Sequence, residues 1–131
     1  AAAAVRLYGA LARAAHERLT AAGVLSRPPQ AGPYLYADLG ELRAPLAARA
    51  ITDSVELEAH LSTALGRPVP GGHRFGDAPD ALRVRISTPP LLGTTDEERQ
   101  RALDSPDPLA APGVADALTG FGSAFGRLAG G

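Results

Sequence analysis

Apolar residues near the start of the chain recur at helical spacing. They are Leu7, Leu11, Ala15 and Leu19. Residues four apart lie on one face of a helix, so we expect a long leading helix within residues 1–23, from about Ala2 to Ala22, with Gly23 as its stop. Charged residues interrupt the apolar run at the same spacing, which fits an amphipathic helix and neither a signal peptide nor a membrane span.

Two later segments alternate between apolar and polar residues, which is typical of half-buried strands. In Tyr34–Asp38 the two tyrosines fall on one face and the aliphatic residues on the other. In Leu82–Ser87 the aliphatic residues point to the core, so Arg83 and Arg85 share the opposite face. Between these segments, His73–Phe75 is predicted to form a short edge strand after a stretch that prolines and glycines break.

Capping residues and helical spacing predict further helices between the strands. Asp53 and Glu56 have the spacing of a capping box, which predicts a helix that ends at Gly66. Leu39–Arg49 also has helical spacing, but Pro45 prevents a regular helix over its first half. We therefore expect one regular and one irregular helix in this part of the chain.

The C-terminal third predicts two helices separated by a proline-broken loop. Thr95 and Glu98 form a second capping box, which starts a short helix. The last helix has an apolar stripe made of Val114, Leu118, Phe121, Phe125 and Leu128. We expect this stripe to pack its aromatic residues on the sheet. Earlier in the chain, residues 26–32 hold two adjacent prolines and are predicted to connect the first helix to the first strand.

This order of elements predicts an α+β fold built as a two-layer sandwich. A small antiparallel sheet of three or four strands would have helices packed on one side, leaving its other face wet or docked on something else. With 131 residues and 45% hydrophobic content, residues 1–131 are expected to form a single domain.

The charge balance and the missing residue types narrow the function. Thirteen basic and 14 acidic residues give a net charge of -1, so nucleic acid is not an expected partner, and no membrane partner is expected either. The chain has no cysteine, which excludes disulfides and thiolate metal sites and fits a cytoplasmic protein. All 13 basic residues are arginine, so the chain contains no lysine.

Most residues that could carry chemistry have a simpler structural explanation. His16, His60 and His73 show no spacing with carboxylates that indicates a metal site. The acidic residues near Asp53 and Asp96 are explained by helix N-termini, where negative charge stabilises the first turn. The glycine pairs do not lie between a strand and a helix N-terminus, as a phosphate cradle requires. We therefore assign no catalytic, cofactor-binding or metal-binding residue.

Arg83 and Arg85 are the exception. Two guanidinium groups on one face of a strand are costly to desolvate, and either could hold a carboxylate through two parallel hydrogen bonds. The alternative is a solvated strand face on which Asp77 or Asp80 balances the positive charge. The pattern alone favours that alternative.

Four stretches, in order and spacing, resemble the C-terminal small domain of class I/II aminotransferases, which are pyridoxal-phosphate enzymes of fold-type I. The stretches are Gly32–Asp38, Ile51–Ser54, Val69–Gly76 and Leu82–Ser87. The resemblance is taken to cover nearly the whole chain, and the stretches that carry it lie between residues 32 and 87. The departures are His73-Arg74, where small residues are more usual before the Phe-Gly pair, and Gly32-Pro33 in place of Gly-aromatic.

The resemblance implies that Arg85 binds the α-carboxylate of an amino acid or 2-oxo acid substrate, with Arg83 as the fallback after a two-residue register slip. It also implies a parent enzyme that uses pyridoxal phosphate, forms a homodimer and carries its cofactor on a large domain that this chain lacks. Because the chain has no lysine, it cannot bind the cofactor covalently and is expected to be inactive alone.

Two other functions stay open. The chain could be a non-catalytic α+β module that binds a carboxylate ligand or a protein through its arginine face. It could also be the small domain of a fold-type I lyase, decarboxylase or acyltransferase, because the fold does not determine the reaction.

Overall fold

The structure of the chain is a computed structural model, and it describes residues 2–27 and 32–130. The helices are α1 (Ala2–Ala21), α2 (Arg43–Ala47), α3 (Ser54–Leu65), α4 (Asp96–Asp104) and α5 (Pro112–Leu128). The strands are β1 (Leu25–Ser26), β2 (Tyr34–Asp38) and β3 (Arg83–Ser87). Short 3-10 helices lie at Gly40–Leu42, Gly72–Phe75, Pro89–Leu92 and Pro108–Ala110. Pro28 and Pro29, in the predicted connection before β2, lie outside the described residues.

The three strands form one antiparallel sheet in the order β1-β2-β3. Strand β2 is central and pairs along its whole length with β3, from Tyr34 opposite Ser87 to Asp38 opposite Arg83. The prediction of a two-layer α+β sandwich with a small antiparallel sheet is confirmed. Strand β1 has only two residues, which is too short to show alternation in the sequence.

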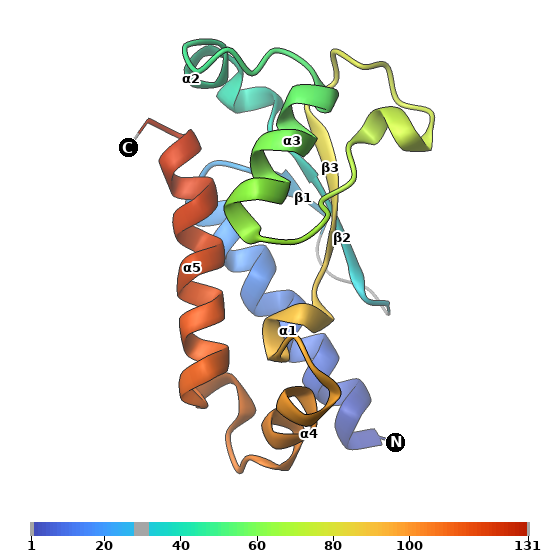
Figure 1. Cartoon of the computed structure of the whole chain (residues 1–131), viewed down its shortest axis with the longest axis vertical. Helices are drawn as coiled ribbons and strands as arrows, with labels where there is room; N and C mark the ends of the chain where they lie inside the picture. The colour runs from blue at the N-terminus through green and yellow to red at the C-terminus, as the bar shows by residue number, and fades with distance from the viewer. Residues whose placement is uncertain (1, 28–31, 131) are drawn as a thin grey trace.

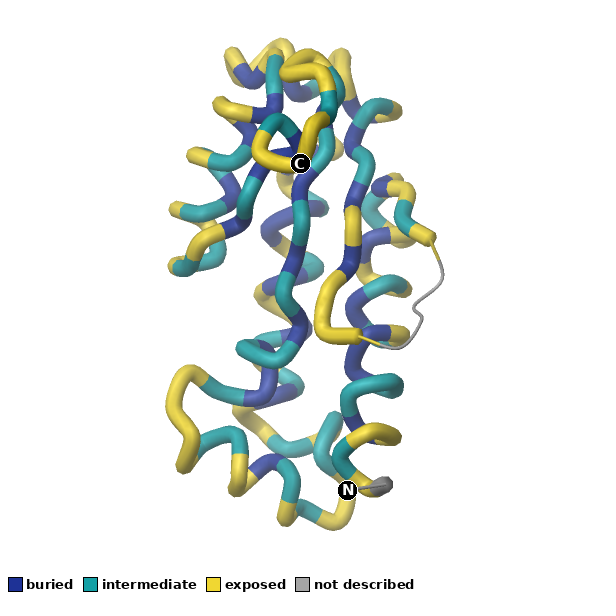
Figure 2. Tube along the Cα trace, turned by 90° about the vertical axis from the view of Figure 1, so that its right-hand side faces the viewer, coloured by how far each residue is buried: buried dark blue, intermediate teal, exposed yellow. Residues whose placement is uncertain are grey.

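The two faces of the sheet differ in the way the alternation predicts. Figure 2 shows buried and less buried positions taking turns along β2 and β3. Helix α1 contacts β1 and β2, and α3 contacts β3, so both helices cover the face formed by the aliphatic residues. Those residues, Leu35, Ala37, Val84 and Ile86, are almost fully buried.

The aromatic stripe of α5 packs against helices, which corrects the prediction that it packs on the sheet. Helix α5 lies mainly against α1, with further contacts to α3 and to the Pro89–Leu92 turn, and Figure 1 shows α3 between α5 and β3. The rings of Phe121 and Phe125 are buried, with their centroids 5.1 Å apart. The sheet is too small to accept a third helix once α1 and α3 cover it, so the stripe fills the groove between those two helices.

Both predicted helix starts have the N-cap half of a capping box, and the glutamate accepts from the Thr52 amide in one and from the Thr95 hydroxyl in the other. Asp53 caps α3 by accepting a hydrogen bond from the Glu56 amide at 2.8 Å, and Thr95 caps α4 by accepting one from the Glu98 amide at 3.1 Å. Helix α3 ends at Gly66, whose φ of 68° is the left-handed conformation that favours glycine. Segment 39–49 is irregular, as Pro45 predicted, and divides into a 3-10 turn and the short helix α2.

The predicted edge strand at His73–Phe75 is wrong, because Gly72–Phe75 forms a 3-10 turn. The chain pairs with β3 only briefly before this turn. Gly71 forms an isolated antiparallel bridge with Val84, and the Arg85 amide donates to the Pro70 carbonyl at 2.8 Å. The chain then leaves the sheet edge and folds over its uncovered face, which places Phe75 beside β3.

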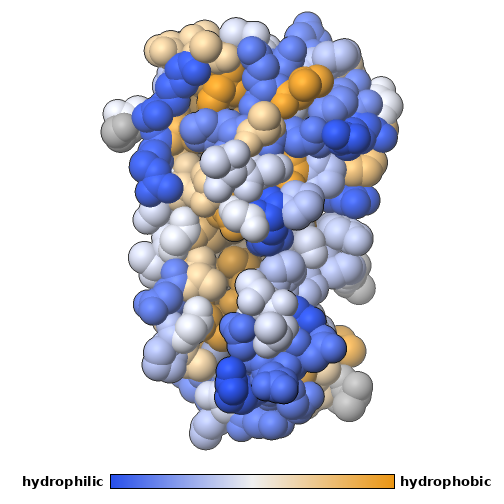
Figure 3. Space-filling model, viewed as in Figure 1, coloured by the Kyte–Doolittle hydropathy of each residue, from blue (hydrophilic) through white to orange (hydrophobic). Residues whose placement is uncertain are grey.

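The outer surface is mainly polar on the side seen in Figure 3, with a narrow apolar band beside α5. None of the helices in the described part of the chain combines the length and the hydropathy needed to cross a membrane.

Candidate functional site

The face of the sheet that α1 and α3 leave uncovered carries Arg83 and Arg85. The two arginines share this face, as the alternation of β3 predicted, and each stands opposite a residue of β2. Tyr36 pairs with Arg85, and Asp38 pairs with Arg83. We call this surface the open face. It also holds much of the exposed large apolar surface of the described chain, namely Leu25, Tyr34, Tyr36 and Phe75.

Arg83 is held by two carboxylates. Its Nε donates to Asp38 Oδ2 at 3.1 Å, and its Nη1 lies 3.5 Å from Asp77 Oδ1. The hydrogen bond that Arg83 donates to Asp38 and the charges of both aspartates raise the pKa of Arg83. The predicted counter-charge at Asp77 is present, whereas Asp80 contributes only its backbone carbonyl, to Arg43. Two of the three guanidinium nitrogens of Arg83, Nε and Nη1, therefore face carboxylates within the chain.

Arg85 has a different environment, although it lies only two residues farther along the same strand. Its guanidinium carbon lies 4.4 Å from the centre of the Tyr34 ring and 4.5 Å from the centre of the Phe75 ring. Within residues 2–27 and 32–130, no carboxylate lies within ion-pair distance of Arg85. Rings stabilise a guanidinium through its faces and leave its N–H groups free to bind an anion.

Tyr36 separates the environments of the two arginines. Its hydroxyl donates a short hydrogen bond to Asp77 Oδ2, and its ring meets Phe75 edge to face, with centroids 6.3 Å apart. Partial burial, the hydrogen bond to Asp77 and the charge of that carboxylate raise the pKa of Tyr36 to about 12. Tyr36 is thus a neutral donor that fixes Asp77 on the Arg83 side and supports Phe75 on the Arg85 side.

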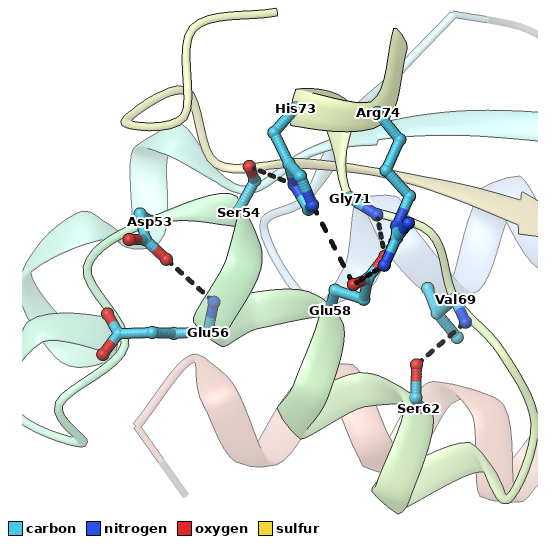
Figure 4. A network of polar contacts seen from close by, with 9 residues as sticks. All are labelled: Asp53, Ser54, Glu56, Glu58, Ser62, Val69, Gly71, His73 and Arg74. Atoms are coloured by element: carbon cyan, nitrogen blue, oxygen red, sulfur yellow. Dashed lines mark hydrogen bonds and ion pairs between the residues drawn. The ribbon is translucent and has the colours of Figure 1, made fainter.

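The turn that carries Phe75 is fixed by a polar network centred on Glu58 of α3 (Figure 4). Glu58 accepts from Arg74 at 2.5 and 2.9 Å and from the Gly71 amide at 3.0 Å. The hydrogen bond from Arg74, with further help from the Gly71 amide, lowers the pKa of Glu58 to about 2 despite its partial burial. On the other side of the turn, His73 Nδ1 lies 2.9 Å from Ser54 Oγ.

Ser54, His73 and Glu58 form a chain of contacts that resembles the order of a hydrolase triad. His73 Nε2 lies 3.9 Å from Glu58 Oε2. Ser54, however, is completely buried, so its hydroxyl cannot reach a substrate. Because both Ser54 and Glu58 belong to α3, these contacts tie the turn to the helix beneath the sheet. The geometry supports a structural function for this network, which positions Phe75.

The two glycines at the start of the turn, Gly71 and Gly72, lie close to neighbouring elements. A Cβ on Gly71 would lie 2.6 Å from the Ser54 carbonyl oxygen. On Gly72 it would lie 2.7 Å from both the Tyr36 hydroxyl and Asp77 Oδ2. A side chain at Gly71 would therefore clash with the backbone of α3, and one at Gly72 would displace the side chains of Tyr36 and Asp77.

Other features of the described residues give weaker candidates. No group of three or more histidine, cysteine, aspartate or glutamate side chains could hold a metal ion there. A cavity of about 220 Å³ between α4 and the start of α5 is floored by Leu92, Ala102 and Val114, with Glu98 and Arg101 at its wall. Only the open face combines an arginine without a carboxylate partner, exposed aromatic rings and a fixed turn.

The sequence predicted the arginines of this site but not their surroundings. These surroundings come from residues far apart in the chain. Tyr34 and Phe75 stack on Arg85, and Glu58 accepts a hydrogen bond from the amide of Gly71 before the turn. The one signal was the Phe75-Gly76 pair, whose glycine has a φ of 91° and ends the 3-10 turn. Comparison of this chain with protein-family models, with curated proteins and with solved structures gives no match.

Proposed function

We propose that this chain is the small domain of a fold-type I aminotransferase, in which Arg85 binds the carboxylate of an amino acid or 2-oxo acid. The observation that carries this proposal is the Arg85 guanidinium, which has no carboxylate partner among the described residues and lies on the uncovered face of the sheet. The four stretches that resemble the family also meet around this sheet, since they include β2, the cap of α3, the Gly72–Phe75 turn and β3.

The choice of Arg85 over Arg83 rests on their partners. Arg83 already donates to Asp38 and faces Asp77, so a substrate carboxylate would have to compete with both. Arg85 would bind a carboxylate with two parallel N–H groups and no competing charge. Such a grip orients the substrate relative to the reacting groups, which contributes to the rate through positioning.

The residues present do not fit a site that holds pyridoxal phosphate. The chain has no lysine, and Arg85, which has no carboxylate partner among the described residues, is already stacked on Tyr34 and Phe75. The cofactor, the lysine and the acid-base chemistry are therefore assigned to a large domain of a longer protein. We extend the proposal to a homodimeric, cytoplasmic parent enzyme, on the strength of the family resemblance and the composition.

A non-catalytic binding module is the second candidate. It is favoured by the exposed apolar side chains on the open face, because uncovered surfaces of this kind commonly mark interaction sites. In that case Arg85 would still bind a carboxylate, but one that belongs to a ligand or a protein partner.

The DNA upstream of the Ala1 codon distinguishes the two. An open frame that encodes a large domain with a cofactor lysine supports the aminotransferase, and a start codon close to Ala1 with no such frame contradicts it. The protein from the longer frame should bind pyridoxal phosphate and transfer an amino group to a 2-oxo acid.

Substitution of Arg85 in that longer protein tests its role. We expect Arg85→Gln to lower kcat/KM at least about thirtyfold, because the substrate carboxylate loses its charge-assisted hydrogen bonds. Arg101→Gln, an exposed arginine of α4, is the matched control and should leave kcat/KM unchanged. An equal effect of both substitutions would contradict the assignment, and so would a decarboxylated or acylated product.

A further inference from the structure

The charges around Arg85 are nearly balanced before any ligand binds. Arg74 is paired with Glu58, and Arg83 is shared between Asp38 and Asp77. The Arg83 cluster therefore contains two carboxylates and one guanidinium, a net charge of about −1 at neutral pH. Among the described residues Arg85 has no carboxylate within ion-pair distance, so its positive charge is available to attract one carboxylate.

The surroundings of Arg85 are otherwise aromatic. Tyr34, Tyr36 and Phe75 are 53%, 40% and 45% exposed, respectively. The first and the last contact the guanidinium directly, and Tyr36 stands opposite Arg85 in the sheet. A ligand whose carboxylate reaches Arg85 would place its neighbouring atoms against the exposed parts of these rings. Apolar or aromatic groups gain from that contact because both surfaces lose water.

A second carboxylate on the ligand would meet a repulsive environment. Two carboxylates, Asp38 and Asp77, lie beside Arg83 on this face, and Arg83 compensates for their charge only in part. The hydroxyl of Tyr36 cannot replace the missing cation, because it already donates to Asp77. Like charges this close cost binding energy, most strongly at low salt.

We infer that the Arg85 site selects monocarboxylates with an apolar or aromatic side chain and discriminates against dicarboxylates. This inference rests on the proposed function, because it names the substrate class of the same site. It corresponds to an amino acid, or the related 2-oxo acid, with an uncharged side chain.

A titration of the present chain with three simple carboxylates tests the inference. Acetate, 3-phenylpropionate and succinate are added at low salt to ¹⁵N-labelled protein, and the Arg85 Nε–H and backbone resonances are followed by NMR. The Kd values should lie in the millimolar range, since a single ion pair at an open surface binds weakly. We expect 3-phenylpropionate to bind about fivefold tighter than acetate, and succinate to bind no tighter than acetate.

Removal of one ring separates the aromatic contribution from the charge. Phe75→Ala should reduce the preference for 3-phenylpropionate over acetate to less than about twofold. Val55→Ala removes an exposed aliphatic side chain from α3 and is the matched control, with no expected change. The amide spectrum shows in each case whether the variant is folded.

The possible outcomes separate this inference from the proposed function. If no carboxylate shifts the Arg85 resonances, the assignment of Arg85 as the carboxylate site is wrong, and the inference falls with it. If succinate binds as tightly as 3-phenylpropionate, or Phe75→Ala leaves the preference intact, the inference alone is wrong. Shifts that depend on protein concentration and not on ligand would show that a second copy covers the open face, which also overturns it.

Discussion

The open face has two halves, one around Arg83 and one around Arg85, and they differ more than their sequence suggests. Around Arg83 the neighbours are carboxylates, and around Arg85 they are aromatic rings. The arginines are two residues apart on one strand, with similar exposure. What separates them is the cross-strand partner and the turn that carries Asp77 and Phe75. The comparison shows that alternation places a side chain on a face, whereas contacts from distant segments determine what that side chain can bind.

The largest effect is expected at Val84, which lies between the two arginines in β3 and points into the core with no exposed surface. Val84→Ala removes buried methyl groups beneath both halves and should lower the free energy of unfolding by about 2 kcal/mol. Urea denaturation measures this loss. Val55→Ala at an exposed position of α3 should change stability by less than about 0.5 kcal/mol, and a similar loss at both sites would contradict the assignment of the covered face.

Gly72 lies where the two halves meet, so an alanine there should disturb both. The added Cβ would clash with the Tyr36 hydroxyl and with Asp77, and it would press on Arg83 Cβ at 3.2 Å. We expect Gly72→Ala to destabilise the protein by about 1–1.5 kcal/mol, because the side chains that it meets can shift. Gly120→Ala in α5 is the matched control, because nothing lies near its Cβ position and a helix gains about 0.5–1 kcal/mol from the change. Equal effects of the two substitutions would argue against the close approach of the turn.

Glu58 tests whether the aromatic half depends on the polar network beneath it. Glu58→Gln weakens the hold on Arg74 and the Gly71 amide, so the turn and Phe75 should move more freely. We expect a loss of about 1 kcal/mol, since solvent screens part of the interaction. Glu97 is exposed, so Glu97→Gln is the control substitution. It should change the free energy of unfolding by less than about 0.5 kcal/mol. An unchanged ring-current shift on the Arg85 side chain would show that Phe75 is positioned by other contacts.

Acid pH should lower the free energy of unfolding in the same way as Glu58→Gln, because it protonates the Glu58 carboxylate. The carboxylate form is favoured in the folded protein, because Arg74 lowers the pKa of Glu58 from 4.5 to about 2. Its contribution to stability is therefore present above pH 4.5 and disappears as the pH falls toward 2. The difference in unfolding free energy between wild type and Glu58→Gln should shrink over that range, by about 1 kcal/mol in total. A difference that is constant with pH would contradict the ion pair.

Local signals in the sequence were sufficient for most of the fold. The capping pairs Asp53/Glu56 and Thr95/Glu98 located two helix starts, and the alternation of β2 and β3 located the faces of the sheet. These features depend on residues within a few positions of one another. The interactions that define them are therefore visible in the local sequence and need no contact with distant segments.

The remaining features depend on contacts between distant segments. Segment 73–75 has the composition of a strand, but Glu58 and the close packing of Gly71 hold it as a turn. Helix α5 has an aromatic stripe that suits a sheet, but α1 and α3 already occupy that face. The contrast between Arg83 and Arg85 has the same origin, since Asp77 and Phe75 reach them through that turn.

The most direct test of the account is to substitute each arginine in turn and measure the binding of one carboxylate. In NMR titrations with 3-phenylpropionate, Arg85→Gln should abolish saturable binding, whereas Arg83→Gln should keep the Kd within about twofold of the wild type. Loss of binding in Arg83→Gln with retention in Arg85→Gln would contradict the assignment of Arg85 as the carboxylate site.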